Sequence, residues 1–296
     1  MLSIKKYAAI DIGSNAIRLL IANVIEEPGK DTQFSKSSLV RVPIRLGQDA
    51  FTSGIISPEN MERIADAMQA YKLLMKVHKV ERHFAAATSA MREAKNADEV
   101  IAFVKERSDI DIQIIDGSKE AAIIASTDLH YLLKSENTYL YVDVGGGSTE
   151  FSLFSKGQLI ASKSFRAGTV RFINNMVHDE VLKEIYDWIR ETTEGYSDIK
   201  LIGSGGNINK IFKMSGKKQE VPLSYFYLKM KFNQLNSMSY EDRVYGLGLN
   251  PDRADVIIPA LSIYLNAMKW SGAKQIFVPK IGLSDGIIKA MYYGRL

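Results

Sequence analysis

Two segments of the sequence each combine an aspartate with a turn of small residues just after it. Asp11 precedes Gly13-Ser14-Asn15, and 143 − 11 = 132 residues later Asp143 precedes Gly145-Gly146-Gly147-Ser148. Such turns expose backbone N–H groups with few side chains in the way, which is how a chain binds phosphate oxygens. An aspartate ending the adjoining strand suits a hydrated cation such as Mg²⁺. Together they predict two hairpins that bind a phosphate chain and its metal between two domains.

A third turn of this kind, Gly203-Ser204-Gly205-Gly206, also follows an apolar run. None of the three is a P-loop, since no Gly-Lys-Ser/Thr closes any of them, and none fits G-x-G-x-x-G. One glycine turn alone is most often only a hairpin. Three in one chain, two of them preceded by Asp, favour phosphate binding.

Two glutamates have both a chemical and a simpler interpretation. Glu120 stands in the first turn of a helix expected from Ser118, where it is either an acid that complements the helix dipole or a general base that deprotonates water. Glu150 begins the strand after the second turn. There it either faces solvent or joins Asp143 on one metal.

Five arginines lie close to predicted turns or strand ends, and the planar guanidinium suits phosphate. Any single one of them is more often a surface residue than a ligand. The set comprises Arg18, Arg45, Arg92, Arg166 and Arg171.

Other catalytic chemistries have little support in this sequence. The absence of Cys excludes disulfides, cysteine nucleophiles and thiolate metal sites. The pair His178-Asp179 lacks the further His ligands of a metal phosphohydrolase, and no G-x-S-x-G elbow supports acyl transfer.

The elements that must position these residues follow an α/β order that occurs twice. In the first half we expect strands on both sides of the Gly13 turn, strands over 38–46, 83–87 and 111–115, and helices from Ser57, over 96–106 and over 118–133. In the second half we expect a hairpin over 138–164, a helix over 179–192, strand 201–203 and a short helix from Ser239. A longer helix over 252–270, kinked or broken at Pro259, strand 275–278 and helix 283–293 complete it. The pattern predicts two α/β domains around a central cleft: 1–117 with 283–296, and 118–282.

Composition fits a soluble, cytoplasmic protein. No apolar run approaches 18 residues and no signal peptide is recognisable, so we expect no membrane partner. The net charge of +4 favours an anionic substrate mildly, but it is far below a nucleic-acid footprint.

The residues discussed above lie in segments by which the sequence resembles the exopolyphosphatase/guanosine pentaphosphate phosphohydrolase family. This family is part of the actin-like ATPase superfamily, and the sequence resembles a short two-domain form of it. The segments that carry the resemblance run in family order along the chain. They are Ile10–Leu19, Arg45-Leu46-Gly47, Ala87–Ala94, Glu120-Ala121, Val142–Phe151, Gly168–Arg171, Gly203–Gly206 and Arg253–Val256.

The resemblance implies two ribonuclease-H-like domains and Mg²⁺- or Mn²⁺-dependent removal of the terminal phosphate from polyphosphate or guanosine pentaphosphate. By position, Glu120 is the base and Arg92 neutralises charge on the transferred group. Asp143 and Glu150 hold the metal, with Asp11 as a further carboxylate. The phosphate-binding set is Ser14, Asn15, Arg18, Gly145, Gly146, Gly147 and Ser148.

Three residues depart from the family pattern: Lys119 stands for an acid, Asn207 for Thr, and Ser284 for Arg. The resemblance makes a homodimer an expectation, although no segment identifies its interface. Two other functions remain open, a non-catalytic sensor of a guanosine alarmone and an ATP-dependent kinase of the same superfamily.

Overall fold

The computed structural model describes residues 1–125, 127 and 136–296 of the chain. The chain divides into two compact units: unit 1 is Met1–Thr127 with Gly282–Leu296, and unit 2 is Asp128–Ile281. Each unit contains its own β-sheet, so the architecture is mixed α/β as predicted. The first boundary lies after the helix α5 (Gly117–Ala125), whereas the sequence put it before this helix. The reason is that α5 packs against α14 (Leu283–Tyr292) of unit 1.

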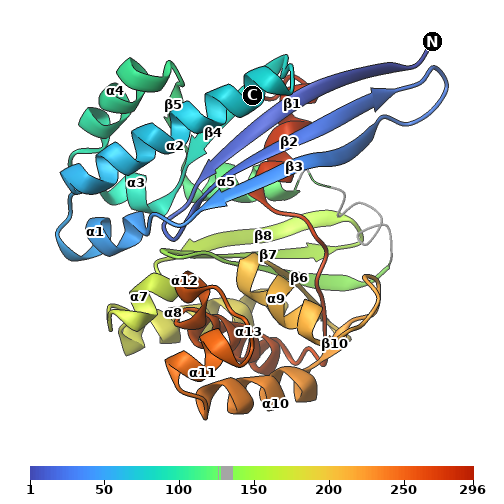
Figure 1. Ribbon diagram of the computed structural model, residues 1–296. Helices are drawn as coiled ribbons and strands as arrows, with labels where there is room; N and C mark the ends of the chain where they lie inside the picture. The colour runs from blue at the N-terminus through green and yellow to red at the C-terminus, as the bar shows by residue number, and fades with distance from the viewer. Residues whose placement is uncertain (126, 128–135) are drawn as a thin grey trace. The chain divides into compact units, whose positions relative to one another are not determined.

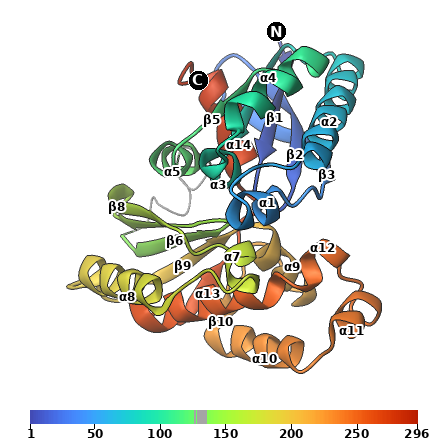
Figure 2. The same cartoon turned by 90° about the vertical axis from the view of Figure 1, so that its left-hand side faces the viewer.

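Unit 1 is built on a five-stranded sheet in the order β3-β2-β1-β4-β5. β1 pairs antiparallel with β2 and parallel with β4, so the hairpin that carries Asp11 lies at the centre of the sheet. α2 lies on one face of this sheet and α14 on the other (Figures 1 and 2). Besides α5 and α14, the elements are β1 (Ser3–Ile12), β2 (Ile17–Glu26), β3 (Gln33–Val42), α1 (Leu46–Thr52), α2 (Pro58–Val77), β4 (Arg82–Ala87), α3 (Ser89–Glu93), α4 (Ala97–Ser108) and β5 (Ile112–Ile114).

Unit 2 is built on a six-stranded sheet in the order β10-β11-β9-β6-β7-β8. Its core lies between this sheet and α13, with α7, α8, α9 and α10 packed against α13 (Figure 1). The elements are β6 (Thr138–Val144), β7 (Thr149–Ser155), β8 (Gln158–Phe165), α7 (Thr169–Ile173), α8 (Asp179–Thr193), β9 (Lys200–Ser204), α9 (Gly206–Met214), β10 (Leu223–Ser224), α10 (Tyr225–Asn236), α11 (Tyr240–Tyr245), α12 (Pro251–Ala254), α13 (Ile257–Ser271) and β11 (Gln275–Phe277).

Two of the helices expected from the sequence begin at a serine whose hydroxyl caps the first turn. The Ser57 hydroxyl accepts from the Asn60 N–H at 3.3 Å with Pro58 in the first turn, and the Ser239 hydroxyl accepts from the Asp242 N–H at 3.0 Å. Asn96 also precedes a helix, but its side chain caps nothing there. It binds the backbone of Ile56 instead.

The structure differs from the predicted elements at several places. The strand predicted over 38–46 is β3, which ends before Pro43 as an edge strand, and α1 follows it. Besides α1, the elements without a counterpart among the predicted ones are α3, α7, α9, β10 and α10. Pro259 lies in the first turn of α13, where its missing N–H costs nothing; the helical stretch is broken at 255–256 instead. The helix predicted over 118–133 is described only as far as Ala125, since residues 126 and 128–135 lie outside the described part.

Candidate functional site

The hairpins β1–β2 and β6–β7 have the same backbone at their turns. The Gly13 N–H donates to the Ala16 carbonyl at 3.2 Å, and the Gly145 N–H donates to the Ser148 carbonyl at 3.0 Å. In both hairpins an aspartate lies two residues before the first glycine of the turn, and its cross-strand partner lies seven residues further along the chain. Asp11 lies opposite Arg18, and Asp143 lies opposite Glu150.

The turn of unit 2 is held from one side by the N-terminal turn of α7. Its three glycine carbonyls accept in succession from the Thr169 N–H to Gly145 (3.0 Å), the Val170 N–H to Gly146 (2.8 Å) and the buried Arg171 Nε to Gly147 (2.7 Å). The C=O and N–H of a trans peptide point in opposite directions. The N–H groups of Gly146, Gly147 and Ser148 therefore point away from α7 in a row. Among the described backbone hydrogen bonds, none is donated by these three groups.

This contact requires glycine at position 168. A Cβ there would stand 2.3 Å from the carbonyl carbon and oxygen of Gly146 and 2.4 Å from the Gly147 nitrogen. At Gly168 two backbone segments are in direct contact. Backbone atoms cannot move aside as the end of a side chain can, so there is no room for a Cβ. The sequence segment Gly168-Thr-Val-Arg171 thus builds the support of the turn.

The two carboxylates of unit 2 are neighbours across the β6–β7 ladder. Directly opposite residues on one face of an antiparallel pair have Cβ atoms about 4.5–5.5 Å apart. Glu150 is buried, and its Oε1 accepts from the Ser164 hydroxyl of β8 at 2.8 Å. The interpretation of Glu150 as a solvent-facing strand residue is wrong because this residue is only 2% exposed.

This pair fits a hard divalent cation that keeps several waters or phosphate oxygens. Mg²⁺ is usually held by one or two carboxylates rather than by a cage of protein ligands. Within the described residues no group of three or more His, Asp or Glu is placed to bind a metal.

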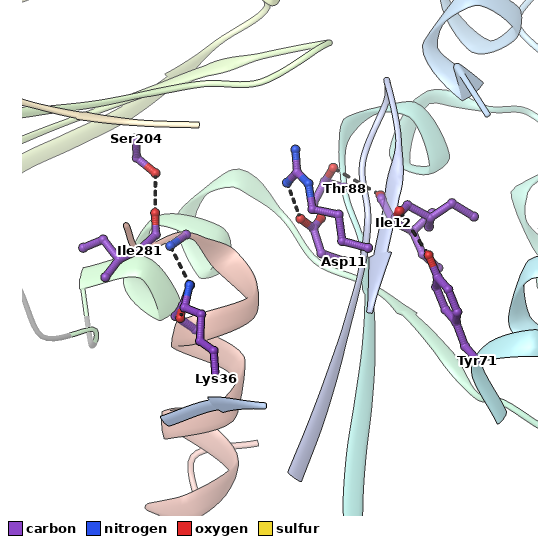
Figure 3. A network of polar contacts seen from close by, with 11 residues as sticks. Asp11, Ile12, Lys36, Tyr71, Thr88, Ser204 and Ile281 are labelled. Atoms are coloured by element: carbon purple, nitrogen blue, oxygen red, sulfur yellow. Dashed lines mark hydrogen bonds and ion pairs between the residues drawn. The ribbon is translucent and has the colours of Figure 1, made fainter. Parts of the chain in front are cut away.

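The third glycine turn lies beside Asp143, because β9 runs parallel to β6 with Ser204 in register with Asp143. Gly205 has a φ of 112°, and a Cβ there would stand 3.3 Å from Asp143 Oδ1. The Ser204 hydroxyl donates to the Ile281 carbonyl at 3.1 Å (Figure 3), and the Tyr264 hydroxyl donates to the Ser204 carbonyl. Burial, aided by the Asp143 charge, raises the pKa of Tyr264 well above its usual value, so the phenol remains a donor.

The turn of unit 1 is supported in a related way by the segment that begins α1. The Gly47 N–H donates to the Ser14 carbonyl at 2.7 Å, and the Arg45 N–H donates to the Asn15 carbonyl at 3.2 Å. The N–H groups of Asn15 and Ala16 therefore point away from this support. The Ser14 and Ser89 hydroxyls lie 2.8 Å apart, which ties the turn to α3. Arg45 has a left-handed backbone, φ 60°.

Asp11 and Arg18 form an ion pair at 2.8 Å (Figure 3). The carboxylate is buried, whereas the Arg18 side chain is 37% exposed. A guanidinium has five N–H donors, so Arg18 retains donors beyond the one directed at Asp11. Asp11, predicted as a metal ligand, thus has a positive charge directly beside it.

Arg92 and Glu120 are brought together within unit 1. Glu120 lies in the first turn of α5, where Asp116 caps the helix by accepting the Lys119 N–H at 2.7 Å. The Arg92 guanidinium lies 3.6 Å from Glu120 Oε2, and the glutamate side chain is only 11% exposed. An acid that served the helix dipole alone would have no need of such burial.

The predicted site residues therefore form two sets. Unit 1 holds Asp11, Ser14, Asn15, Arg18, Arg92 and Glu120; unit 2 holds Asp143, Gly145, Gly146, Gly147, Ser148 and Glu150. Sequence reasoning gave no role to Ser89, Ser164 or Tyr264. Ser89 lies within the segment Ala87–Ala94 that carries the resemblance, whereas Ser164 and Tyr264 lie in none of the matching segments.

The residue after Ser284 takes part in an ion pair. Lys36 of β3 forms an ion pair with Asp285 at 2.8 Å (Figure 3), and Asp285 accepts the Gly282 N–H at the start of α14. Burial raises the pKa of Asp285 against the effect of Lys36. Lys119 is exposed.

The chain is similar to a known protein family. Residues 37–293 match the Ppx/GppA phosphatase family. The chain belongs to this family. The match covers most of the chain, from β3 to the end of α14.

The chain is also similar to individual relatives and to solved structures. The chain is 31% identical to exopolyphosphatase 2 of Mycobacterium tuberculosis over 60% of this chain and 57% of that protein. It is 27% identical to the guanosine-5'-triphosphate,3'-diphosphate pyrophosphatase of Photobacterium profundum over 96% of this chain and 59% of that protein. The crystal structure of an exopolyphosphatase from Cytophaga hutchinsonii superposes with a TM-score of 0.84 at 25% identity, covering 98% of each chain.

The chain spans little more than half the length of these two curated relatives. The fold class predicted from the sequence, two actin-like ATPase units, is that of the family. No helix among the described residues is both long and apolar enough to cross a bilayer.

Proposed function

We propose that this Ppx/GppA family member hydrolyses the terminal phosphoanhydride bond of inorganic polyphosphate or guanosine pentaphosphate. The observation that carries the proposal is the row of N–H groups of Gly146, Gly147 and Ser148, directed away from α7 and next to the Asp143–Glu150 pair. Backbone donors in a row bind phosphate oxygens, and paired carboxylates bind the cation that accompanies them.

In this proposal Glu120 is the general base that takes the proton from the attacking water. Its burial and its contact with Arg92 support a positioned carboxylate over one that only complements the helix dipole. Arg92 holds Glu120 in the resting protein and neutralises charge that develops on the transferred phosphoryl group. Ser14, Asn15 and Arg18 bind further phosphate oxygens.

Asp143 and Glu150 would hold the divalent cation, Mg²⁺ or Mn²⁺, with Asp11 as an additional carboxylate already neutralised by Arg18. Such a cation, when bound, polarises phosphoryl oxygens and offsets their charge. The names of the M. tuberculosis and P. profundum relatives give the two candidate substrates. The homodimer stays a prediction.

The test is phosphate release with Mg²⁺ from short polyphosphate, long polyphosphate, guanosine pentaphosphate and ATP. We expect release from at least one of the first three. Glu120→Gln should lower turnover by ~10²–10⁴ while substrate binding is largely kept.

A matched control is Glu180→Gln, which neutralises an exposed first-turn acid of α8. It should leave turnover within about twofold of the original. Equal losses of turnover in both variants would indicate that Glu120 only complements the helix dipole. Metal-dependent binding without release from any substrate would favour the sensor, and phosphate transfer from ATP to an acceptor would favour the kinase.

A further inference from the structure

The Glu150 carboxylate lies on the middle strand of a three-stranded stretch, between two polar neighbours. β7 pairs with β6 on one side and with β8 on the other, and the register places Asp143 and Ser164 on either side of Glu150. A carboxylate as buried as this one must be hydrogen-bonded to remain ionised at low cost.

The Ser164 hydroxyl supplies such a bond. It donates to Glu150 Oε1 at 2.8 Å, a charge-assisted contact that is stronger than one between neutral groups. The terminal torsion of a glutamate is broad and settles little by itself. A hydrogen bond to Oε1 restricts rotation about this torsion, and it therefore fixes the direction of the second oxygen as well.

The two residues before Ser164 on β8 contact other side chains than Glu150. Lys163, whose side chain alternates to the opposite face of the sheet, forms an ion pair with Glu184 at 2.9 Å. Ser162 shares the face of Ser164, and its hydroxyl lies 2.9 Å from the Ser152 hydroxyl. Of these three neighbouring residues on β8, only Ser164 has a hydrogen bond to a Glu150 oxygen among those described.

We propose that Ser164 is a positioning residue that orients Glu150 for a divalent cation shared with Asp143. Hydrogen-bond partners behind a metal ligand fix its orientation, and their loss typically costs 10–100-fold in metal affinity. The inference rests on one part of the proposed function, the binding of a divalent cation by Asp143 and Glu150. It does not require that the protein hydrolyses phosphoanhydrides.

The experiment is a titration of the full chain with Mn²⁺ alone, followed by electron paramagnetic resonance of the free ion, without any substrate. Ser164→Ala should raise the Kd for Mn²⁺ by about 10–100-fold. Ser164→Thr, which keeps the hydroxyl, should stay within about threefold of the original. Ser162→Ala removes the equivalent hydroxyl from the same strand face and should leave the Kd unchanged.

A second measurement separates positioning from structural damage. With an active substrate, Ser164→Ala should raise the metal concentration for half-maximal rate in proportion to the Mn²⁺ Kd, while kcat at saturating metal stays within about threefold. A melting temperature like that of Ser162→Ala would accompany this result.

Three outcomes would overturn the inference. They are wild-type Mn²⁺ affinity in Ser164→Ala, an equal loss in Ser162→Ala, and no Mn²⁺ binding by the unmodified chain. Absence of phosphate release, with the Mn²⁺ pattern as expected, would overturn the proposed function and leave the role of Ser164 intact.

Discussion

The β1–β2 hairpin of unit 1 and the β6–β7 hairpin of unit 2 place an aspartate at the same point, two residues before the turn. The residue opposite that aspartate is Arg18 in the first hairpin and Glu150 in the second. The same backbone therefore presents a neutralised pair in one copy and two negative charges in the other. We infer that the charge of one cross-strand residue decides which copy receives a cation.

The supports of the two turns also differ. In unit 2 the turn rests on backbone atoms around Gly168, and a buried arginine completes the contact. In unit 1 the turn rests on the start of α1, where side chains of Phe51 and Ser14 line the space beside Gly47. The glycine turn of unit 2 should therefore tolerate fewer substitutions than the glycine turn of unit 1.

The largest effect is expected from Gly168→Ala compared with Gly47→Ala. The first Cβ meets backbone at 2.3 Å, so we expect about 3 kcal/mol or more of destabilisation and loss of activity. The second Cβ meets Phe51 Cε2 at 2.7 Å and Ser14 Cβ at 2.9 Å, and rotation of the Phe51 ring should limit the cost to about 1–3 kcal/mol. Denaturant unfolding of both variants measures the difference. Equal costs would remove the distinction between the two supports.

Charge removal at the cross-strand position should give the next largest effect. Glu150→Gln should raise the Mg²⁺ concentration for half-maximal activity by about 100-fold or more, since a ligand is lost rather than its partner. Arg18→Gln should leave that concentration within about threefold and raise the substrate KM about tenfold, because a phosphate contact is lost. The measurement is a Mg²⁺ titration of initial rates at several substrate concentrations. A Mg²⁺ requirement altered more by Arg18→Gln would move the cation to unit 1.

A smaller effect is expected from two buried tyrosines that donate to backbone carbonyls close to the turns. Tyr71 donates to Ile17 at 3.2 Å (Figure 3), and Tyr264 donates to Ser204. Each Tyr→Phe variant leaves a buried carbonyl without this donor, and both tyrosines are only 1% exposed, so we expect about 1–2 kcal/mol for each variant. Urea unfolding gives both values. No measurable cost in either variant would contradict this contribution.

The smallest effect is a pH dependence of stability confined to the glycine turn of unit 1 and its support by α1. Burial acts to raise the pKa of Asp49, but hydrogen bonds from Ser57 and Asn60 outweigh it and leave the pKa below its ordinary value of 3.8. The ionised form is thus favoured by folding, and its contribution is present above pH 3.8 and lost as pH falls through the lower folded value. Asp49 anchors α1, whose Gly47 N–H supports the Ser14 carbonyl.

Amide exchange checks this expectation. Between pH 5 and pH 2.5 the protection factor of the Gly47 N–H should fall by several-fold, while that of the Thr169 N–H should remain constant. Asp49→Asn should remove the pH dependence at Gly47. A parallel fall at Thr169 would point to general acid unfolding instead.

The hairpins themselves could be predicted from the sequence because their information is local. An apolar run, an aspartate and a turn of small residues lie within about ten residues of one another. The pairing of Asp143 with Glu150 follows from the same short segment. The first turn of α5, which carries Glu120, follows from another local segment that begins at Asp116.

What supports the turns could not be predicted, because those contacts join residues far apart in the chain. The Ser14 and Ser89 hydroxyls are 75 residues apart, and no pattern at either position announces the other. α1 was missed because Arg45 has a left-handed backbone and Gly47 weakens helix propensity. The break near 255–256 was assigned to Pro259, since a proline is a break signal in the sequence even where a helix begins with it.

The return of the chain to unit 1 through α14 has a consequence for synthesis on the ribosome. Unit 2 occupies 281 − 127 = 154 residues between the two parts of unit 1. At roughly 5–20 residues per second, the face of β1 that α14 covers waits about 8–30 s for its partner helix. During that interval unit 2 has all its strands and can fold, while β1 and β2 display apolar surface. A chaperone that binds nascent chains should therefore select unit 1, and a chain released before α14 should be the aggregating species.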